Sequence, residues 1–148
     1  SKPILVLISD FSMLDGIVSE IPPLYERLIK CFWPGPLTLV FPASPYLSTL
    51  ITGATGTVGV RISPHPAATE LCRRWGQPLT ATSANLAGGN PASRAGKVKK
   101  MFGDRIDYVL DGGKTSAAKC STVIGTNRDG LYLIREGQIV FDEIKAAL

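Results

Sequence analysis

The sequence lacks any apolar run long enough to cross a membrane. Residues 4–8 form one of its longest wholly apolar stretches, far below the ~20 residues that a spanning helix needs. Cysteine is also scarce, because Cys31, Cys72 and Cys120 are an odd number at wide spacing. Such usage does not match a disulfide framework and is typical of a reducing compartment. We therefore expect a soluble, cytoplasmic protein.

Histidine is nearly absent too. The single His65 stands between two prolines, and no CxxC or HxxxH pair is present to start a zinc site. No nucleophile elbow of the GxSxG kind accompanies His65, so a residue at the start of a helix is favoured over a member of a catalytic triad. We expect no metal site built by the protein itself and no covalent nucleophile.

Charge of one sign is in modest excess. Sixteen Lys and Arg stand against twelve Asp and Glu, which leaves +4 over 148 residues. This excess suits a phosphate-bearing ligand but falls short of a dedicated nucleic-acid binder. The length predicts one domain over residues 1–148. Because the chain runs from Ser1 almost directly into a strand-like segment, we expect it to begin partway through a domain.

Glycine and proline divide the sequence into short segments that switch between strand and helix periodicity. The expected strands are residues 4–8, 37–41, 57–62, 79–83, 108–110, 121–124 and 131–135. The expected helices are residues 24–32, 66–75, 142–148 and a basic helix capped by Ser93 that ends at Phe102. Residues 127–130 predict a hairpin turn. This order predicts an α+β fold, a mixed β-sheet layered with helices.

Two faces can be assigned from periodicity. Residues 24–32 place Leu24, Leu28 and Cys31 on one stripe, which we expect to be buried. In residues 57–62 the valines and isoleucine should face the core, whereas Thr57, Gly59 and Arg61 face the other way.

Arg61 is the most informative charged residue. A charge at the end of a half-buried strand must lie at a wet edge or in a cleft, and the competing interpretation is a surface pair with a carboxylate. Ala81, Ser83 and Asn85 share one face at a strand end before a glycine-rich loop. They could hold phosphate oxygens, although Ser and Asn are also ordinary turn residues.

Other motifs are weaker. Gly53, Gly56 and Gly59 precede a strand and lack the following helix of a dinucleotide fingerprint. Residues 113–115 match only the end of a P-loop, so this segment could be either a surface turn or an anion-binding loop. The basic cluster of residues 97–100 predicts a solvated helix face, with RNA contact as the second interpretation.

Six short motifs stand in a particular order along nearly the whole chain. They are Trp33-Pro34-Gly35-Pro36-Leu37-Thr38, Val58-Gly59-Val60-Arg61-Ile62, His65-Pro66, Thr82-Ser83-Ala84-Asn85-Leu86, Ser121-Thr122-Val123 and Arg135-Glu136-Gly137. Taken together, they resemble the YrdC family, the threonylcarbamoyl-AMP synthases. The resemblance implies a YrdC/RibB-like twisted mixed sheet flanked by helices. It also implies an enzyme that uses ATP, bicarbonate and L-threonine, with Mg²⁺ accompanying ATP.

The product implied by this resemblance is threonylcarbamoyl-adenylate, with release of pyrophosphate, for the threonylcarbamoyladenosine modification of tRNA. A tRNA-modifying complex would then act downstream, and weak tRNA or RNA contact is an accompanying expectation. By the same resemblance, the ATP-binding positions are Lys2, Thr57, Ser83, Asn85 and Arg135, and the threonine-binding positions are Arg61, Ala81 and Ser121.

The chain also departs from the family. It contains neither a Pro-Thr-Glu-Thr-like threonine-binding segment nor the Lys-x-Arg motif that precedes Ser-Lys-Pro, and Leu7 replaces a common histidine. We therefore expect an N-terminally truncated, single YrdC-like domain with an incomplete site and an exposed sheet edge. Two alternatives are a carbamoyl-adenylate-handling domain of a hydrogenase-maturation carbamoyltransferase and a non-catalytic RNA-binding module. The latter lacks aromatic stacking platforms beside its basic residues.

Overall fold

The structure is a computed structural model that describes residues 4–53, 55–115 and 119–148. It divides into two compact units, one formed by residues 1–81 together with 119–148 and the other by residues 82–118. The expectation of a single domain over residues 1–148 stays a prediction.

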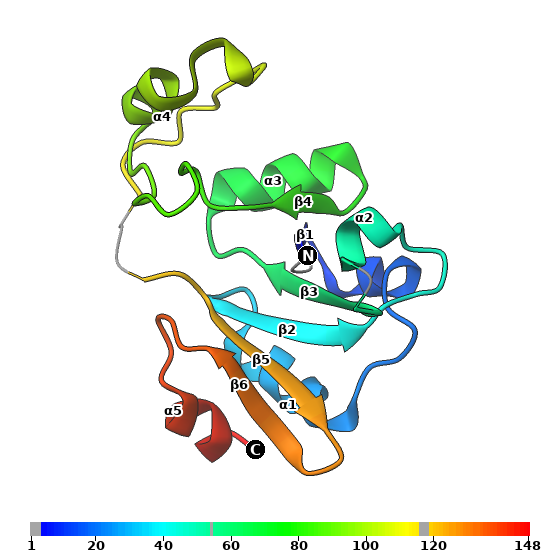
Figure 1. The fold of residues 1–148 in the computed structure, drawn as a ribbon. Helices are drawn as coiled ribbons and strands as arrows, with labels where there is room; N and C mark the ends of the chain where they lie inside the picture. The colour runs from blue at the N-terminus through cyan, green and yellow to red at the C-terminus, as the bar shows by residue number, and fades with distance from the viewer. Residues whose placement is uncertain (1–3, 54, 116–118) are drawn as a thin grey trace. The chain divides into compact units, whose positions relative to one another are not determined.

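The first unit is built on a six-stranded mixed sheet in the order β4-β1-β3-β2-β5-β6 (Figure 1). Its strands are β1 (Leu5–Ile8), β2 (Leu37–Pro42), β3 (Thr57–Ile62), β4 (Leu79–Ala81), β5 (Thr122–Asn127) and β6 (Gly130–Arg135). Strand β1 runs parallel to β3 and β2 runs parallel to β5, whereas the other neighbours are antiparallel. The expected mixed sheet is therefore confirmed.

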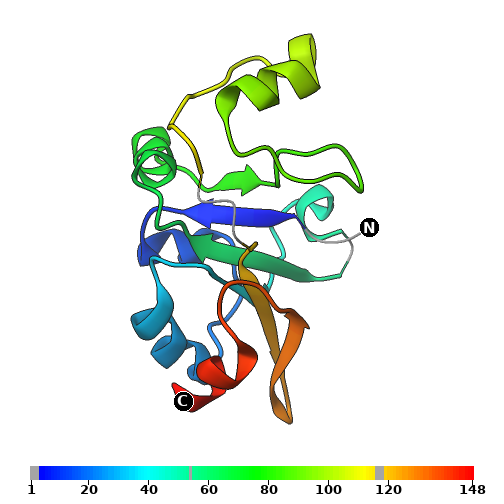
Figure 2. The same ribbon diagram turned by 90° about the vertical axis from the view of Figure 1, so that its left-hand side faces the viewer.

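The helices of the first unit are η1 (Phe11–Gly16), α1 (Pro23–Phe32), α2 (Thr49–Thr52), α3 (Pro66–Trp75) and α5 (Phe141–Ala146). Helices α1 and α5 lie on the same side of the β5–β6 hairpin (Figure 2). They cover one face of the sheet, where Leu28 and Ile144 are fully buried in one core with Leu39, Val60 and Ile124 of three strands. The opposite face carries the alternate residues of these strands.

Helix α1 turns a different face to the core than periodicity predicts. The buried residues are Tyr25 and Leu28, whereas Leu24 is 37% exposed and Cys31 is exposed. Tyr25 lies edge-on against Phe41 at 5.0 Å between ring centroids, and its hydroxyl donates to the Val40 carbonyl at 2.8 Å. The prediction is therefore confirmed for Leu28 and wrong for Leu24 and Cys31, because a tyrosine that satisfies its hydroxyl can occupy the core.

The second unit contains α4 (Ala95–Phe102) and η2 (Gly103–Arg105). The N-cap of α4 is Arg94, with no side-chain capping bond, so the predicted Ser93 cap is wrong. The predicted strand at residues 108–110 is also wrong, since these residues form neither helix nor strand. Lys97, Lys99 and Lys100 are exposed, as expected for a solvated face.

Strand β6 forms one edge of the described sheet and carries exposed apolar residues. Tyr132 is 42% exposed, Leu133 39% and Ile134 50%. The exposed sheet edge expected from an absent N-terminal segment stays a prediction, because nothing links β6 to such a segment. Among all the residues that the structure describes, no helix is long and apolar enough to cross a membrane.

The two leucines of α1 allow a direct test of the core. We expect Leu28→Ala to lower the free energy of unfolding by about 2–5 kcal/mol, since it leaves a cavity in a fully buried site. Leu24→Ala on the same helix should cost less than about 1 kcal/mol, because its side chain already contacts water. Urea unfolding followed by circular dichroism measures both, and equal losses would contradict the assigned face.

Candidate functional site

The face of the sheet opposite the core carries the candidate site. On β3, Val58, Val60 and Ile62 are buried in the core, and the alternate residues Gly59 and Arg61 face the other way. A Cβ on Gly59 would lie 3.4 Å from Thr38 Cγ2, so the Thr38 side chain of β2 lies over this glycine. The absence of a side chain at Gly59 thus allows the Thr38 side chain to pack on this face next to Arg61.

Arg61 is half-buried and lacks an evident counter-charge. Its Nε is completely buried and has no hydrogen-bond partner among the described residues. Burial lowers the pKa of Arg61, and the positive charge of Arg135 lowers it further, while Cys120 acts in the opposite direction. Two cations therefore influence each other on one face of the sheet. The surface pairing with a carboxylate that the sequence left open is not found in the described part of the chain.

Arg135 is tied to the beginning of β5. Its Nη2 donates to the Ser121 carbonyl at 3.0 Å and lies 3.4 Å from Ser121 Oγ. Ser121 Oγ in turn lies 2.9 Å from Thr38 Oγ1 in a buried hydrogen bond. We call Arg61, Arg135, Ser121 and Thr38 the arginine–hydroxyl cluster.

Strand register explains why these residues meet. Arg61 follows Val60, which pairs with Leu39 of β2, and Thr38 precedes Leu39. Thr38 pairs with Val123 of β5, and Val123 pairs with Arg135 of β6 next to a register shift. The cluster is thus a row across β3, β2, the residue directly before β5, and β6, and its members are separated in sequence by up to about a hundred residues.

The arrangement is suited to bind an anion. Guanidinium groups donate in a planar fork that matches carboxylate and phosphate oxygens, and hydroxyls complete such a site. A buried Arg61 Nε with no partner carries a cost in free energy that a bound oxyanion would offset. The cluster is therefore a candidate carboxylate- or phosphate-binding site.

The sequence-predicted residues are only partly brought together. Arg61, Ser121 and Arg135 lie in the cluster, and Thr38 is a member that the sequence analysis missed. Thr38 ends the motif of residues 33–38, but its place beside Arg61 follows from the pairing of β2 with β3, which the sequence does not show. Its hydroxyl is buried, with the residue only 3% exposed, and this could not be read from a single strand.

The other predicted positions lie elsewhere. Thr57 is four residues from Arg61 on β3, about 13 Å along the strand, and its hydroxyl bonds Thr55 Oγ1 at 2.8 Å. Ala81 ends β4 opposite Leu5. Lys2 lies outside the described residues.

Ser83 and Asn85 belong to the second unit. The Asn85 amide donates to the Ser83 carbonyl at 2.9 Å, which closes a tight turn. Asn85 Nδ2 donates to the Leu86 carbonyl at 2.8 Å, while its Oδ1 is buried without a partner among the described residues. The pair forms a turn with one unsatisfied acceptor, and its role toward ATP stays a prediction.

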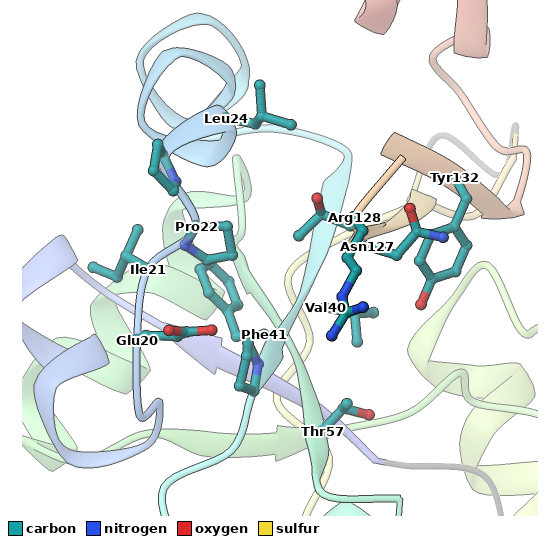
Figure 3. Close-up of a pocket in the computed structure, with 13 residues that line it drawn as sticks. Glu20, Ile21, Pro22, Leu24, Val40, Phe41, Thr57, Asn127, Arg128 and Tyr132 are labelled. Carbon is teal, nitrogen blue, oxygen red and sulfur yellow. The ribbon is translucent and has the colours of Figure 1, made fainter. Parts of the chain in front are cut away.

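A separate cavity of about 500 Å³ lies at the hairpin end of β5 and β6 (Figure 3). Phe41 and Pro22 contribute apolar walls, and Arg128 of the hairpin lies between them and Tyr132. Among the predicted site residues, Thr57 lines this cavity and the members of the arginine–hydroxyl cluster do not. The cavity and the arginine–hydroxyl cluster are therefore separate places on the same sheet.

Together, the mixed sheet and its cluster of two arginines and two hydroxyls define an α+β protein with a candidate oxyanion-binding site. The chain belongs to the Sua5/YciO/YrdC family, because residues 1–137 match the family model, which is described as "Telomere recombination". The resemblance inferred from the six motifs is thereby confirmed.

Three curated relatives carry the same name. The threonylcarbamoyl-AMP synthases of Pyrococcus abyssi and Bacillus subtilis are each 37% identical over 99% of this chain, which covers 43% of either protein. The threonylcarbamoyl-AMP synthase of Idiomarina loihiensis is 36% identical over 83% of the chain and 67% of that protein. The chain thus spans less than half the length of the first two relatives.

Solved structures confirm the fold. The structure titled as P. abyssi Sua5 complexed with L-threonine superposes with a TM-score of 0.94 at 37% identity, over 99% of this chain and 43% of that one. E. coli YciO superposes with a TM-score of 0.85 at 24% identity, over 96% of this chain and 69% of that one. A full-length HypF is 19% identical with a TM-score of 0.76 and, like YciO, shows the fold alone.

The electrostatics of the cluster lead to a prediction about Arg61. We expect Arg61→Met to raise the melting temperature in low-salt buffer, because it removes a half-buried cation beside another cation. The same variant should lose most of the stabilisation that sulfate gives the unchanged protein, since sulfate would bind the two arginines. Differential scanning fluorimetry over a sulfate series measures both effects.

Arg73→Met is the control for this experiment. Arg73 is an exposed arginine of α3, and its partner Glu70 keeps a second ion pair with Arg74 at 2.6 Å. Its sulfate dependence should equal that of the unchanged protein. Equal sulfate dependence of the Arg61 variant would instead show that the cluster binds no anion.

Proposed function

We propose that the protein is a threonylcarbamoyl-AMP synthase, a nucleotidyltransferase that forms threonylcarbamoyl-adenylate and pyrophosphate from L-threonine, bicarbonate and ATP. The observation that carries this proposal is the arginine–hydroxyl cluster, which combines buried hydroxyls with two guanidinium groups that form no ion pair among the described residues. The names of the relatives and the threonine complex of P. abyssi Sua5 support it.

The chemistry requires the groups that the cluster offers. The unprotonated amine of threonine attacks the carbon of bicarbonate, a C–O bond breaks, and water leaves to give a carbamate. A carbamate oxygen then attacks the α-phosphorus of ATP while the bond to the bridging oxygen breaks and pyrophosphate leaves. Negative charge is present on every reactant, so positioned cations and hydrogen-bond donors stabilise the transition state.

Each residue receives a role in this scheme. Arg61 would hold the threonine carboxylate, since a guanidinium forms paired hydrogen bonds with a carboxylate. Ser121 would contact threonine through its hydroxyl, and Ala81 would contribute backbone groups. Arg135, held by Ser121, would meet ATP phosphate oxygens, together with Lys2, Thr57, Ser83 and Asn85. No residue is asked to form a covalent intermediate.

Magnesium enters this proposal with ATP. Mg²⁺ keeps several water ligands and is commonly bound through substrate phosphates. The cluster itself supplies guanidinium groups, which repel a cation, and hydroxyls, which are weak ligands. The fit therefore favours coordination by the phosphate oxygens, with the arginines balancing the remaining negative charge.

The product would serve the threonylcarbamoyladenosine modification of tRNA in the cytoplasm, where a tRNA-modifying complex would consume it. The exposed Lys97, Lys99 and Lys100 of α4 are the residues we propose for weak RNA contact. Such contact would weaken steeply with salt, because it depends on phosphate charges.

The activity has a direct test. The whole protein, incubated with ATP, Mg²⁺, bicarbonate and threonine, should release pyrophosphate, and omission of any one substrate should abolish the release. Pyrophosphate release that does not need threonine would indicate a carbamoyl-adenylate-handling domain instead. No release from the whole protein would refute the proposal.

Arg61 allows the substrate roles to be separated. We expect Arg61→Ala in the whole protein to lower kcat/KM for threonine. The loss should correspond to about 2 to 4 kcal/mol of transition-state stabilisation, the range for losing a buried charge-assisted partner. ATP affinity, measured by calorimetry, should change far less. Equal losses toward both substrates would argue for a structural role of Arg61.

A further inference from the structure

The beginning of β5 is held by the segment that follows β6. Thr122 is fully buried, and its hydroxyl donates to the Ile139 carbonyl at 2.6 Å. The same oxygen accepts from the backbone amides of Gly137 at 3.0 Å and Ile139 at 3.1 Å. One side chain therefore satisfies three backbone groups of a neighbouring segment, which uses the full hydrogen-bonding capacity of a hydroxyl.

Further bonds join the same two segments. The Gln138 amide donates to the Cys120 carbonyl at 3.0 Å, and Gln138 Nε2 donates to the Lys119 carbonyl at 2.7 Å. Gly137 is buried, and a Cβ there would collide with the carbonyl groups of Cys120 and Ser121. Only glycine permits this approach, so the contact between the segments is close as well as hydrogen-bonded.

These bonds surround Ser121. The carbonyl before it is held by Gln138, the side chain after it is held by Ile139 and Gly137, and its own carbonyl accepts from Arg135 at 3.0 Å. Arg135 lies two residues before Gly137, so both ends of the Arg135–Ser121 contact are attached to the same pair of segments.

We propose that Thr122 is a positioning residue, whose buried hydroxyl fixes β5 against residues 137–139 and so sets the places of Ser121 and Arg135 in the arginine–hydroxyl cluster. Its role in the reaction rests on the proposed function, whereas its effect on anion binding does not. Thr122 faces the core, away from the cluster, and touches no proposed substrate. It acts through its neighbours.

Replacing Thr122 by valine removes the hydrogen bonds of its hydroxyl and leaves its shape nearly unchanged. Valine has nearly the shape of threonine, so Thr122→Val keeps the packing beside Leu37 but removes the acceptor for two amides and the donor to one carbonyl. Those three groups must then find other partners, which requires the segments to move apart. Ser121 and Arg135 would move first, because Ser121 is the neighbour of Thr122 in the chain and Arg135 is hydrogen-bonded to Ser121.

The test uses the whole protein and three variants. For Thr122→Val we expect the KM for threonine to rise about tenfold while kcat changes by less than about threefold, because binding groups are displaced. Thr122→Ser, which keeps the hydroxyl, should restore KM to within about threefold of the unchanged protein. Thr69→Val is the matched control. Thr69 lies in α3, outside the cluster, and the substitution removes the hydrogen bond of 2.8 Å from its hydroxyl to the Ser63 carbonyl.

A second readout separates this proposal from the proposed function. Sulfate-dependent stabilisation should fall in Thr122→Val and remain in Thr122→Ser and Thr69→Val, whether or not the protein makes threonylcarbamoyl-adenylate. If the unchanged protein releases no pyrophosphate, the proposed function fails and the sulfate series still decides the role of Thr122. Thr122→Val with the KM and sulfate response of Thr69→Val would overturn the positioning role.

The design allows for a variant that does not fold. In that case Gln138→Ala decides, since Gln138 is exposed and its side chain contributes one bond to the Lys119 carbonyl. We expect a KM for threonine about threefold higher, with urea unfolding unchanged. An unchanged KM would overturn the proposal.

Discussion

Two guanidinium groups on one face of a sheet are the constraint on which the rest of this structure depends. Arg61 is half-buried, with its Nε unpartnered in the described chain, and Arg135 adds a second positive charge nearby. Burial of Arg61 beside a second, solvent-exposed cation costs free energy, which other interactions of the fold must offset. These are the core on the opposite face and the hydrogen bonds to Ser121.

The beginning of β5 contributes to both the core and the cluster. Thr122 is buried with the core residues, whereas Ser121 beside it belongs to the cluster, so the stability of β5 and the geometry of the site are physically linked. Strand alternation makes this link unavoidable, because neighbouring residues point to opposite faces. The cluster therefore depends on contacts that no ligand touches, and the buried hydroxyl of Thr122 is the clearest of them.

Local patterns predicted much of the fold. The strand at residues 57–62 and the helix at residues 66–75 have the predicted bounds, and Gly76 ends that helix with a positive φ of 69°. Predictions went wrong where a tertiary contact overrode a local pattern. Tyr25 replaces Leu24 in the core because Phe41 and the Val40 carbonyl receive its ring and hydroxyl. Residues 108–110 form no strand, since apolar composition alone supplies no partner for their backbone.

The sequence by itself determined the class of the fold, the family and three members of the cluster, because order and spacing of motifs are properties of the chain. Arg61 was identifiable even without the family, as a charge on an alternating strand. Tertiary structure alone decided that Thr38, Thr122 and Gly137 matter. Thr38 bonds a residue 83 positions away, and Thr122 accepts from an amide 15 positions away. Contacts between segments so far apart depend on strand register, which only the folded sheet establishes.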